Sequence, residues 1–293
     1  MIILIIILLV ILVSILWQRW ELGKFEVTRY IVRSAKIKSS VSVAVIADLH
    51  GFSYGENNHK LLEETAKIKP QAIFIPGDML VSKYPETFAI ALETFAELVK
   101  IAPVYYSYGN HESRLREEEC VSHELFEQYM QKVRALGVTV MDTQTRSISL
   151  GENQVMLSAL ELELDYYEKG SIVPLENSYM REHLPLVQPE KFQILLAHNP
   201  AYAEQYAGWG ADVTFCGHNH GGLVRIPGIG SLISPQLTLF PKYDAGKFEL
   251  EGRSVIVSRG LGTHTFHIRV FNRAELLAVE FAPQKNGGRL WEF

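Results

Sequence analysis

The stretch VSVAVIADLH, residues 41–50, decides the fold. Its apolar part, residues 41–47, predicts a buried strand, and the polar residues Asp48 and His50 follow directly. Four further segments of the chain repeat this layout of an apolar run followed by Asp, Asn or His. In α/β proteins, functional side chains gather in the crevice at the carboxyl ends of the strands. The repeated layout therefore predicts one site assembled from five strand ends.

These polar segments combine the donor atoms that bind divalent transition metals. Their carboxylate and amide oxygens and imidazole nitrogens suit Mn, Fe or Zn better than a thiolate-only site would. In an extended segment, residues two apart point the same way, so we expect Asp48 and His50 to reach one metal and His218 and His220 to be neighbours. The five segments are Asp48-Leu49-His50, Gly77-Asp78, Gly109-Asn110-His111-Glu112, Ala197-His198-Asn199 and Gly217-His218-Asn219-His220.

In order and spacing, the five segments resemble the motifs of the calcineurin-like metallophosphoesterases: D-x-H, G-D, G-N-H-E/D, a single H, and G-H-x-H. Two later stretches, residues 241–243 (PKY) and 258–262 (SRGLG), resemble signatures of the membrane-linked bacterial, phosphodiesterase-like branch of that family. The resemblance implies an α/β fold of four layers, an αββα sandwich. In this fold two mixed sheets pack face to face and helices flank them.

The resemblance also implies a dinuclear centre of two divalent metal ions, most often Mn, Zn or Fe. Asp48, His50, Asp78 and His220 would bind one metal, and Asp78, Asn110, His198 and His218 the other. Two such cations can hold a bridging hydroxide that attacks phosphorus. His111 is then a catalytic acid near the leaving group rather than a ligand, and Glu112 orients it by a hydrogen bond.

Each motif, taken alone, could also be an ordinary turn or a structural contact. Gly-Asp and Gly-Asn pairs are common in turns that bind nothing, so only the ordered set of five indicates a site. Arg259 and Arg269 follow the metal motifs, and a guanidinium suits the oxygens of a substrate phosphate. Salt bridges within the protein would explain these two arginines equally well.

The chain is therefore predicted to hydrolyse a phosphodiester or pyrophosphate bond, in a membrane-associated or lipid-linked nucleotide. A lipid-linked substrate would need an apolar groove beside the metals, formed by residues 162–189 or 232–240. The alternatives are a phosphomonoesterase or nuclease of the same fold, or a metal-binding protein without catalysis. A net charge of −5 gives no sign of a nucleic-acid partner. The oligomeric state stays open.

The first 17 residues are apolar apart from Ser14. As a helix they would be roughly 25 Å long, near the lower limit for crossing a bilayer. A cleaved signal peptide is the rival interpretation, but no basic residue precedes the apolar run. Basic residues follow it, which predicts a single-pass protein with a cytoplasmic catalytic domain, an exported domain being the alternative. The predicted order is a transmembrane anchor (1–18), a basic juxtamembrane linker (19–40), a metallophosphoesterase domain (41–283) and a tail (284–293).

Length and composition limit the number of domains and the kinds of site that the chain can contain. A chain of 293 residues with 47% hydrophobic residues suits one large domain or two small ones. The two cysteines, Cys120 and Cys216, form neither a disulfide framework nor a cysteine-rich zinc site. Residues 41–136 predict alternating strands and helices, whereas the later part is richer in strands, with a hairpin around residues 151–153. Residues 162–189 have no clean period and are predicted to form a variable insert or lid.

Overall fold

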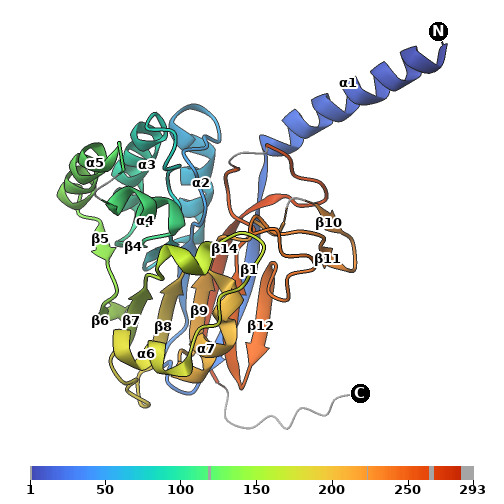
Figure 1. Cartoon of the computed structure of the whole chain (residues 1–293). Coiled ribbons are helices and arrows are strands. Elements are labelled where there is room, and N and C mark those ends of the chain that lie inside the picture. The colour runs from blue at the N-terminus through green and yellow to red at the C-terminus, as the bar shows by residue number, and fades with distance from the viewer. Residues whose placement is uncertain (1, 118–119, 223, 264–266, 285–293) are drawn as a thin grey trace.

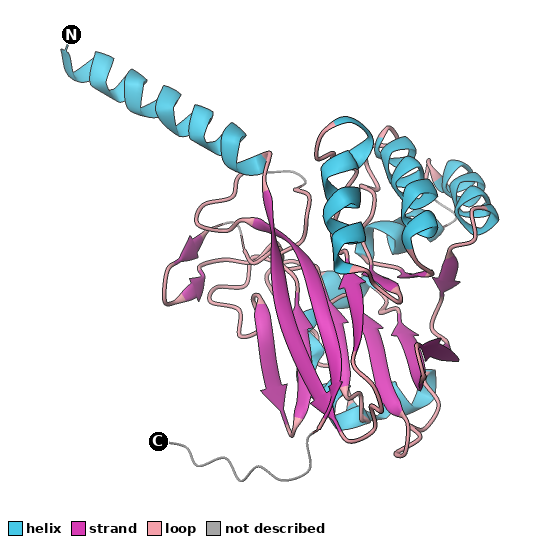
Figure 2. Cartoon of the chain, turned by 180° about the vertical axis from the view of Figure 1, so that it is seen from behind, coloured by secondary structure: helices cyan, strands magenta, loops and turns pink. Residues whose placement is uncertain are grey.

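The computed structural model describes residues 2–117, 120–222, 224–263 and 267–284, which form two six-stranded sheets and their flanking helices (Figures 1 and 2). In spatial order, the first sheet contains β1 (Phe25–Ser34), β14 (Ala274–Pro283), β2 (Val41–Val45), β3 (Ile73–Pro76), β4 (Val104–Ser107) and β5 (Thr139–Met141). The second contains β12 (Gly246–Leu250), β13 (Arg253–Val257), β9 (Val213–Cys216), β8 (Phe192–Ala197), β7 (Asn153–Leu160) and β6 (Thr145–Leu150). A short pair, β10 (Arg225–Ile226) and β11 (Gly230–Ser231), lies apart from both sheets.

Both sheets are mixed, as predicted. Strands β2 to β5 are parallel, and so are β7, β8, β9 and β13. Antiparallel pairs join β14 to β2 in the first sheet, and β6 to β7 and β12 to β13 in the second. The β6–β7 pair is the predicted hairpin. The parallel strands matter most here, because their carboxyl ends carry the polar segments.

Three hydrophobic cores separate four layers. Successive residues of a strand face opposite sides, so Ile73 and Ile75 pack under helices while Phe74 points to the other sheet. The core between the sheets contains Phe74, Phe192 and Phe215. Helices of the first half cover the outer face of one sheet, and later helices cover the outer face of the other. The helices are α2 (His59–Ile68), α3 (Thr87–Ile101), α4 (Asn110–Arg116), α5 (His123–Ala135), α6 (Asn177–His183) and α7 (Ala203–Trp209), with 3-10 turns η1 (Glu56–Asn58), η2 (Leu164–Tyr167) and η3 (Pro200–Tyr202).

The predicted linker, residues 19–40, is not a connector, because it contains the edge strand β1. This strand pairs in parallel with β14 along its whole length, from Phe25 beside Ala274 to Ser34 beside Pro283. Val32 is buried in the core between the sheets, and Phe25 and Val27 pack against the core under the helices. The basic residues of this stretch concealed the apolar positions that fix the strand.

The N-terminal helix α1 (Ile2–Leu22) projects from the body and continues beyond the predicted end at residue 18 (Figure 1). Its last turns are held by the body, since Arg273 donates to the Glu21 carboxylate at 2.9 Å. The structure contains no helix, among the residues it describes, that is both long and apolar enough to cross a membrane. The predicted transmembrane anchor is therefore not confirmed. The predicted tail lies outside the described residues except for Gln284.

Candidate metal centre

The seven predicted metal ligands lie together at the carboxyl ends of strands from both sheets. Asp48 and His50 follow β2, Asp78 follows β3, and Asn110 begins the helix α4 after β4. From the second sheet, His198 follows β8, and His218 and His220 follow β9. All seven residues are at least nine-tenths buried. The carboxyl ends of strands in the two sheets thus bring together side chains that are up to 172 positions apart in the sequence.

The backbone at these positions differs from the extended geometry expected for alternating ligands. Five of the seven residues have a left-handed backbone, with φ between 50° and 66°: Asp48, His50, Asp78, His218 and His220. Non-glycine residues rarely adopt this region, and it costs of order 1–3 kcal/mol per residue unless the surroundings enforce it. Tight left-handed turns therefore aim these side chains into the space between the sheets.

Backbone carbonyls fix the orientation of three imidazoles. The Nδ1 atoms of His50, His198 and His220 lie 3.2, 2.7 and 3.2 Å from the carbonyl oxygens of Leu80, Pro76 and Gly262. A ring that donates through Nδ1 presents Nε2 as an acceptor, which is how metal-binding histidines are usually held. The structure thus presents the Nε2 atoms of all three rings to the centre of the site.

Asp78 lies where two groups of donors meet. Its Oδ2 is 3.1 Å from His198 Nε2 and 3.8 Å from His50 Nε2. Its Oδ1 is fixed by the backbone N–H of His111 at 2.9 Å. Asn110 belongs to the second group, because its Oδ1 lies 2.8 Å from His218 Nδ1. Three compact sets of donor atoms result: Asp48, His50 and His220; His50, Asp78 and His111; and Asp78, His198 and His218.

The donor set fits cations better than it fits a metal-free core. His50 Nε2 and His220 Nε2 are 3.0 Å apart, and both face each other as acceptors when their Nδ1 atoms donate to carbonyls. Two acceptors at this distance need a shared proton or a cation between them. Among the described residues, the buried Oδ2 atom of Asp48 also has no hydrogen-bond donor. Both features are relieved by positive charge at the centre.

Glycines allow the carboxylates to sit this close to the backbone. A Cβ atom on Gly109 would lie 2.2 Å from Asp78 Oδ1, and one on Gly217 would lie 2.6 Å from Asp48 Oδ2. Each distance is a steric clash. The glycines of the G-N-H-E and G-H-N-H segments are therefore required by the position of the carboxylates, and any side chain there would displace a candidate ligand.

The electrostatics of the metal-free centre are set by burial and by close charges. Burial raises the pKa of the Asp48 carboxyl to about 7, although His198 opposes the shift. Burial lowers the pKa of His198, but the Asp78 carboxylate outweighs it and raises that pKa to about 9. Burial acts on Asp78 as well, but the imidazoles of His198 and His111 hold its pKa well below its usual range. The centre therefore binds protons that a metal must displace.

The sequence of the chain matches the model of the calcineurin-like phosphoesterase family over residues 41–222, which includes all seven candidate ligands. The chain belongs to the calcineurin-like phosphoesterase family. It is 26% identical to phosphodiesterase YaeI of Escherichia coli over 89% of each chain. It is 22% identical to the uncharacterized metallophosphoesterase YkuE of Bacillus subtilis, over 86% of this chain and 83% of that one. A solved phosphopantetheinyl hydrolase from Mycobacterium tuberculosis aligns with a TM-score of 0.47 at 11% identity, covering 75% of this chain and 89% of the other.

His111 of this phosphoesterase lies at the edge of the centre, with its ring 5.0 Å from the ring of His50. Its Nδ1 accepts the backbone N–H of Ser82 at 3.0 Å. In the neutral ring the proton therefore belongs to Nε2. That Glu112 orients His111 stays a prediction. The Glu112 carboxylate accepts the backbone N–H groups of Asp78, Met79 and Gly109, each at 2.9 Å.

One side chain beside the centre was missed by sequence reasoning. Tyr167, in η2, places its ring against His218 at 5.0 Å and His198 at 6.0 Å between ring centroids. It comes from the segment predicted as a lid, and it is 5% exposed. No motif marks it, because its relevance depends on how residues 162–189 fold back over β8 and β9.

The two arginines predicted to contact substrate bind groups of the protein. The Arg259 guanidinium pairs with Glu275 at 2.6 Å and with Glu26, which links β14 to β1. Arg269 is 2% exposed, and its guanidinium donates to the backbone carbonyls of Gly260, Gly262 and Asn272. Contacts within the protein, the alternative given for both arginines, are therefore present, and a contact with substrate phosphate stays a prediction.

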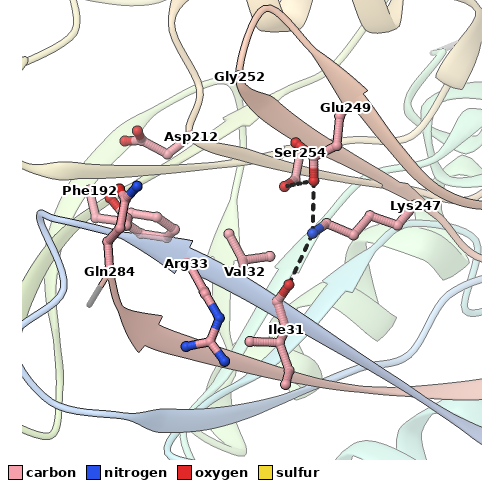
Figure 3. Close-up of a pocket in the computed structure, with 11 residues that line it drawn as sticks. Ile31, Val32, Arg33, Phe192, Asp212, Lys247, Glu249, Gly252, Ser254 and Gln284 are labelled. Atoms are coloured by element: carbon pink, nitrogen blue, oxygen red, sulfur yellow. Dashed lines mark hydrogen bonds and ion pairs between the residues drawn. The ribbon is translucent and has the colours of Figure 1, made fainter. Parts of the chain in front are cut away.

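A separate cavity of about 450 Å³ lies at the amino ends of β8 and β9, away from the metal-ligand candidates (Figure 3). Phe192 and Asp212 line it beside the β12–β13 hairpin. Lys247 lies in its wall, donates to the Ile31 carbonyl at 3.0 Å and pairs with Glu249 at 2.7 Å. Because the candidate ligands follow the opposite ends of these strands, this cavity cannot hold a group that reacts at the centre.

Proposed function

We propose that this chain hydrolyses a phosphodiester or pyrophosphate bond at a dinuclear metal centre. One observation carries the proposal: the three compact donor sets overlap, with His50 and Asp78 each shared by two sets. Overlapping sets suit two ions held side by side better than one isolated ion. The relative named phosphodiesterase, YaeI, favours a diester as the first substrate class to test.

In this proposal, two divalent ions such as Mn, Zn or Fe occupy the centre. Asp78 would serve both ions, since it belongs to two of the donor sets. Bound cations of this kind stabilise charge on phosphoryl oxygens and lower the pKa of a bound water. The first metal would be held by Asp48, His50, Asp78 and His220, and the second by Asp78, Asn110, His198 and His218. The carbonyl partners of His50, His198 and His220 would keep their Nε2 atoms turned toward the ions.

His111 supplies the proton that the departing oxygen needs. Its Nδ1 accepts the Ser82 N–H, so the neutral ring carries its proton on Nε2. The ring is 5% exposed, which limits competition by bulk water. The residues therefore divide the work: Asp, Asn and His ligands hold the ions, and His111 donates a proton or a hydrogen bond to the leaving group.

The organic part of the substrate has a candidate place in a cavity of about 240 Å³ that adjoins the His218–His220 segment through Asn219. Asn219, between the ligands His218 and His220, lines this cavity and donates to the Tyr243 carbonyl at 2.8 Å. Ile172 and Phe240, from the two segments predicted to form a groove, also line it. Because the polar Lys242 and Glu204 also line it, the cavity suits a group with both apolar and polar parts. A lipid-linked nucleotide stays a prediction.

The test uses the full chain, stripped of metal and refilled with Mn, Zn or Fe in parallel. Each form is assayed with bis(4-nitrophenyl) phosphate, a diester, and 4-nitrophenyl phosphate, a monoester. The proposal predicts metal-restored hydrolysis, faster for the diester, that Asp78→Ala abolishes. Faster hydrolysis of the monoester would show that the chain is a phosphomonoesterase and not a phosphodiesterase. Bound ions without hydrolysis of either ester would contradict the hydrolytic function for simple esters and favour a binding role.

The location of the chain stays a prediction as well. A catalytic domain on the cytoplasmic side of a membrane follows only from the basic residues after the N-terminal apolar run. Fractionation of cells that express the full chain, followed by protease treatment of sealed vesicles, tests it. Recovery in the membrane fraction with protection from external protease only in right-side-out vesicles is expected, and recovery without membranes would contradict it.

A further inference from the structure

Within the part of the chain that the structure describes, Arg269 is a buried cation without a carboxylate partner. Its side chain is 2% exposed, and no ion pair involves it among the described residues. Its Nη2 donates to the carbonyl oxygens of Gly262 at 2.8 Å and Gly260 at 3.1 Å, and its Nη1 donates to that of Asn272 at 3.3 Å. Burying a charge is costly, and such groups are weak evidence for stability alone. The three carbonyls that it binds indicate another role.

Two of those carbonyls belong to the loop after β13, which packs tightly on the first metal segment. The N–H groups of Leu261 and Gly262 donate to the carbonyl oxygens of Ala47 and Asp48, at 3.0 and 2.6 Å. A Cβ atom on Gly262 would lie 2.0 Å from the Leu49 carbonyl oxygen. The position of this loop therefore decides the position of the Asp48 backbone.

The same loop and its neighbour hold His220 from two sides. The Gly262 carbonyl that Arg269 binds is also the partner of His220 Nδ1, at 3.2 Å. Asn272, whose carbonyl accepts from Arg269, donates through its side chain to the His220 carbonyl at 2.7 Å. One guanidinium thus fixes the groups that set both the ring and the backbone of His220.

We propose that Arg269 is a positioning residue for the first metal, acting through Gly262 and Asn272 on His220 and through the loop on Asp48. This inference rests on the proposed dinuclear centre. Arg269 contacts neither metal nor substrate in this arrangement. Its planar fork can hold several carbonyls in fixed directions, which a lysine ammonium on a flexible stem cannot do. Groups that orient metal ligands in this way typically change metal affinity by about 10- to 100-fold when they are replaced.

The N-terminal helix reaches the same residue. Gln18 of α1 accepts the backbone N–H of Arg269 at 3.0 Å and donates to its carbonyl at 2.9 Å. Both main-chain groups of Arg269 are therefore tied to the base of α1. The Gln18 side chain is uncharged and only half-buried, so Gln18→Ala can loosen Arg269 without removing buried charge.

The experiment measures metal binding by the full chain with Co²⁺, which reports its ligand geometry by absorption. Wild type should bind two ions, and failure to do so would defeat the proposed dinuclear centre itself. Two backgrounds separate the ions: His218→Ala removes a ligand of the second metal, and His220→Ala removes a ligand of the first. Adding Arg269→Met to His218→Ala should weaken the remaining ion by about 10- to 100-fold. Added to His220→Ala, it should change nothing.

Further variants keep the test decisive. Arg269→Lys should bind the first metal with intermediate affinity and an altered absorption spectrum, and Gln18→Ala should weaken it in the same direction by less. The matched control is Arg273→Gln, which breaks a different link to α1, through Glu21, and should leave both ions unaffected. If Arg269→Met does not fold, the affinities of Arg269→Lys and Gln18→Ala for the first metal test the proposal. Wild-type affinity for the first metal in the folded Arg269 variants, or equal losses at both ions, would overturn the proposal.

Discussion

His111 shows how one contact assigns a proton. The Ser82 N–H occupies Nδ1 at 3.0 Å, so the neutral ring donates through Nε2. If that proton assists the leaving group, His111→Ala should lower kcat by roughly 10²- to 10⁴-fold, the usual contribution of an acid catalyst. Metal content, measured by elemental analysis, should stay at the wild-type value.

A matched variant, Ser82→Ala, tests whether the loss of kcat comes from the His111 ring itself. Ser82→Ala removes only the hydroxyl near Nδ1 and leaves the backbone N–H in place, so its loss of kcat should be much smaller. The nearest alternative is that His111 is a ligand, since it also lies in a compact donor set with His50 and Asp78. Loss of one ion from His111→Ala would establish that alternative.

The raised pKa values at the centre predict pH-dependent metal binding. In the metal-free protein, His198 is protonated below about 9 and Asp48 below about 7. A divalent ion must displace these protons, so its apparent affinity should fall as the pH is lowered from 9 to 6. The fall should approach roughly tenfold per pH unit for each proton displaced.

Calorimetric titrations in buffers of different ionisation enthalpy count the protons released on metal binding. His198→Ala removes one titrating group, so this variant should release fewer protons on binding metal than the wild type does. Its affinity should still fall toward low pH, because the pKa of Asp48 rises further when His198 no longer opposes the effect of burial. Unchanged affinity of the wild-type chain from pH 6 to 9, with no proton released, would show that neither group carries a proton there.

At the scale of elements, the sequence predicts strands and helices well where an apolar run meets a polar motif. Strands β2, β3, β4, β8 and β9 were all anticipated, because their apolar runs end at candidate ligands. β1 was missed because its partner β14 begins about 250 positions later, and local charge masked the pattern. The left-handed turns after the strands were missed because tertiary contacts, such as those at Gly217 and Gly262, enforce them.

The 3-10 turn η2 leads to a prediction about metal binding. Tyr167 lies against His198 and His218, both candidate ligands of the second metal. Tyr167→Ala should weaken binding of that ion by about 2- to 10-fold, the equivalent of one aromatic contact. Tyr167→Phe keeps the ring and should bind as wild type does. Metal titration distinguishes the two, and an equal loss in Tyr167→Phe would transfer the role from the ring to the hydroxyl.

At the scale of the whole molecule, the site exists only because the two sheets face each other. The first sheet supplies Asp48, His50, Asp78 and Asn110, and the second supplies His198, His218 and His220. The ordered motifs allow this gathering to be predicted from sequence. The carbonyl partners, the contacts of Glu112 and the burial of Arg269 could not be, because they depend on distances between loops that only the assembled fold defines.

The central claim is that these seven residues hold two metal ions with Asp78 between them. Crystals of the full chain soaked in Mn²⁺ and measured at the manganese absorption edge test it most directly. The account predicts two anomalous peaks per chain, about 3.5–4 Å apart, on either side of the Asp78 carboxylate. A single peak, or two peaks that do not share Asp78, would contradict it.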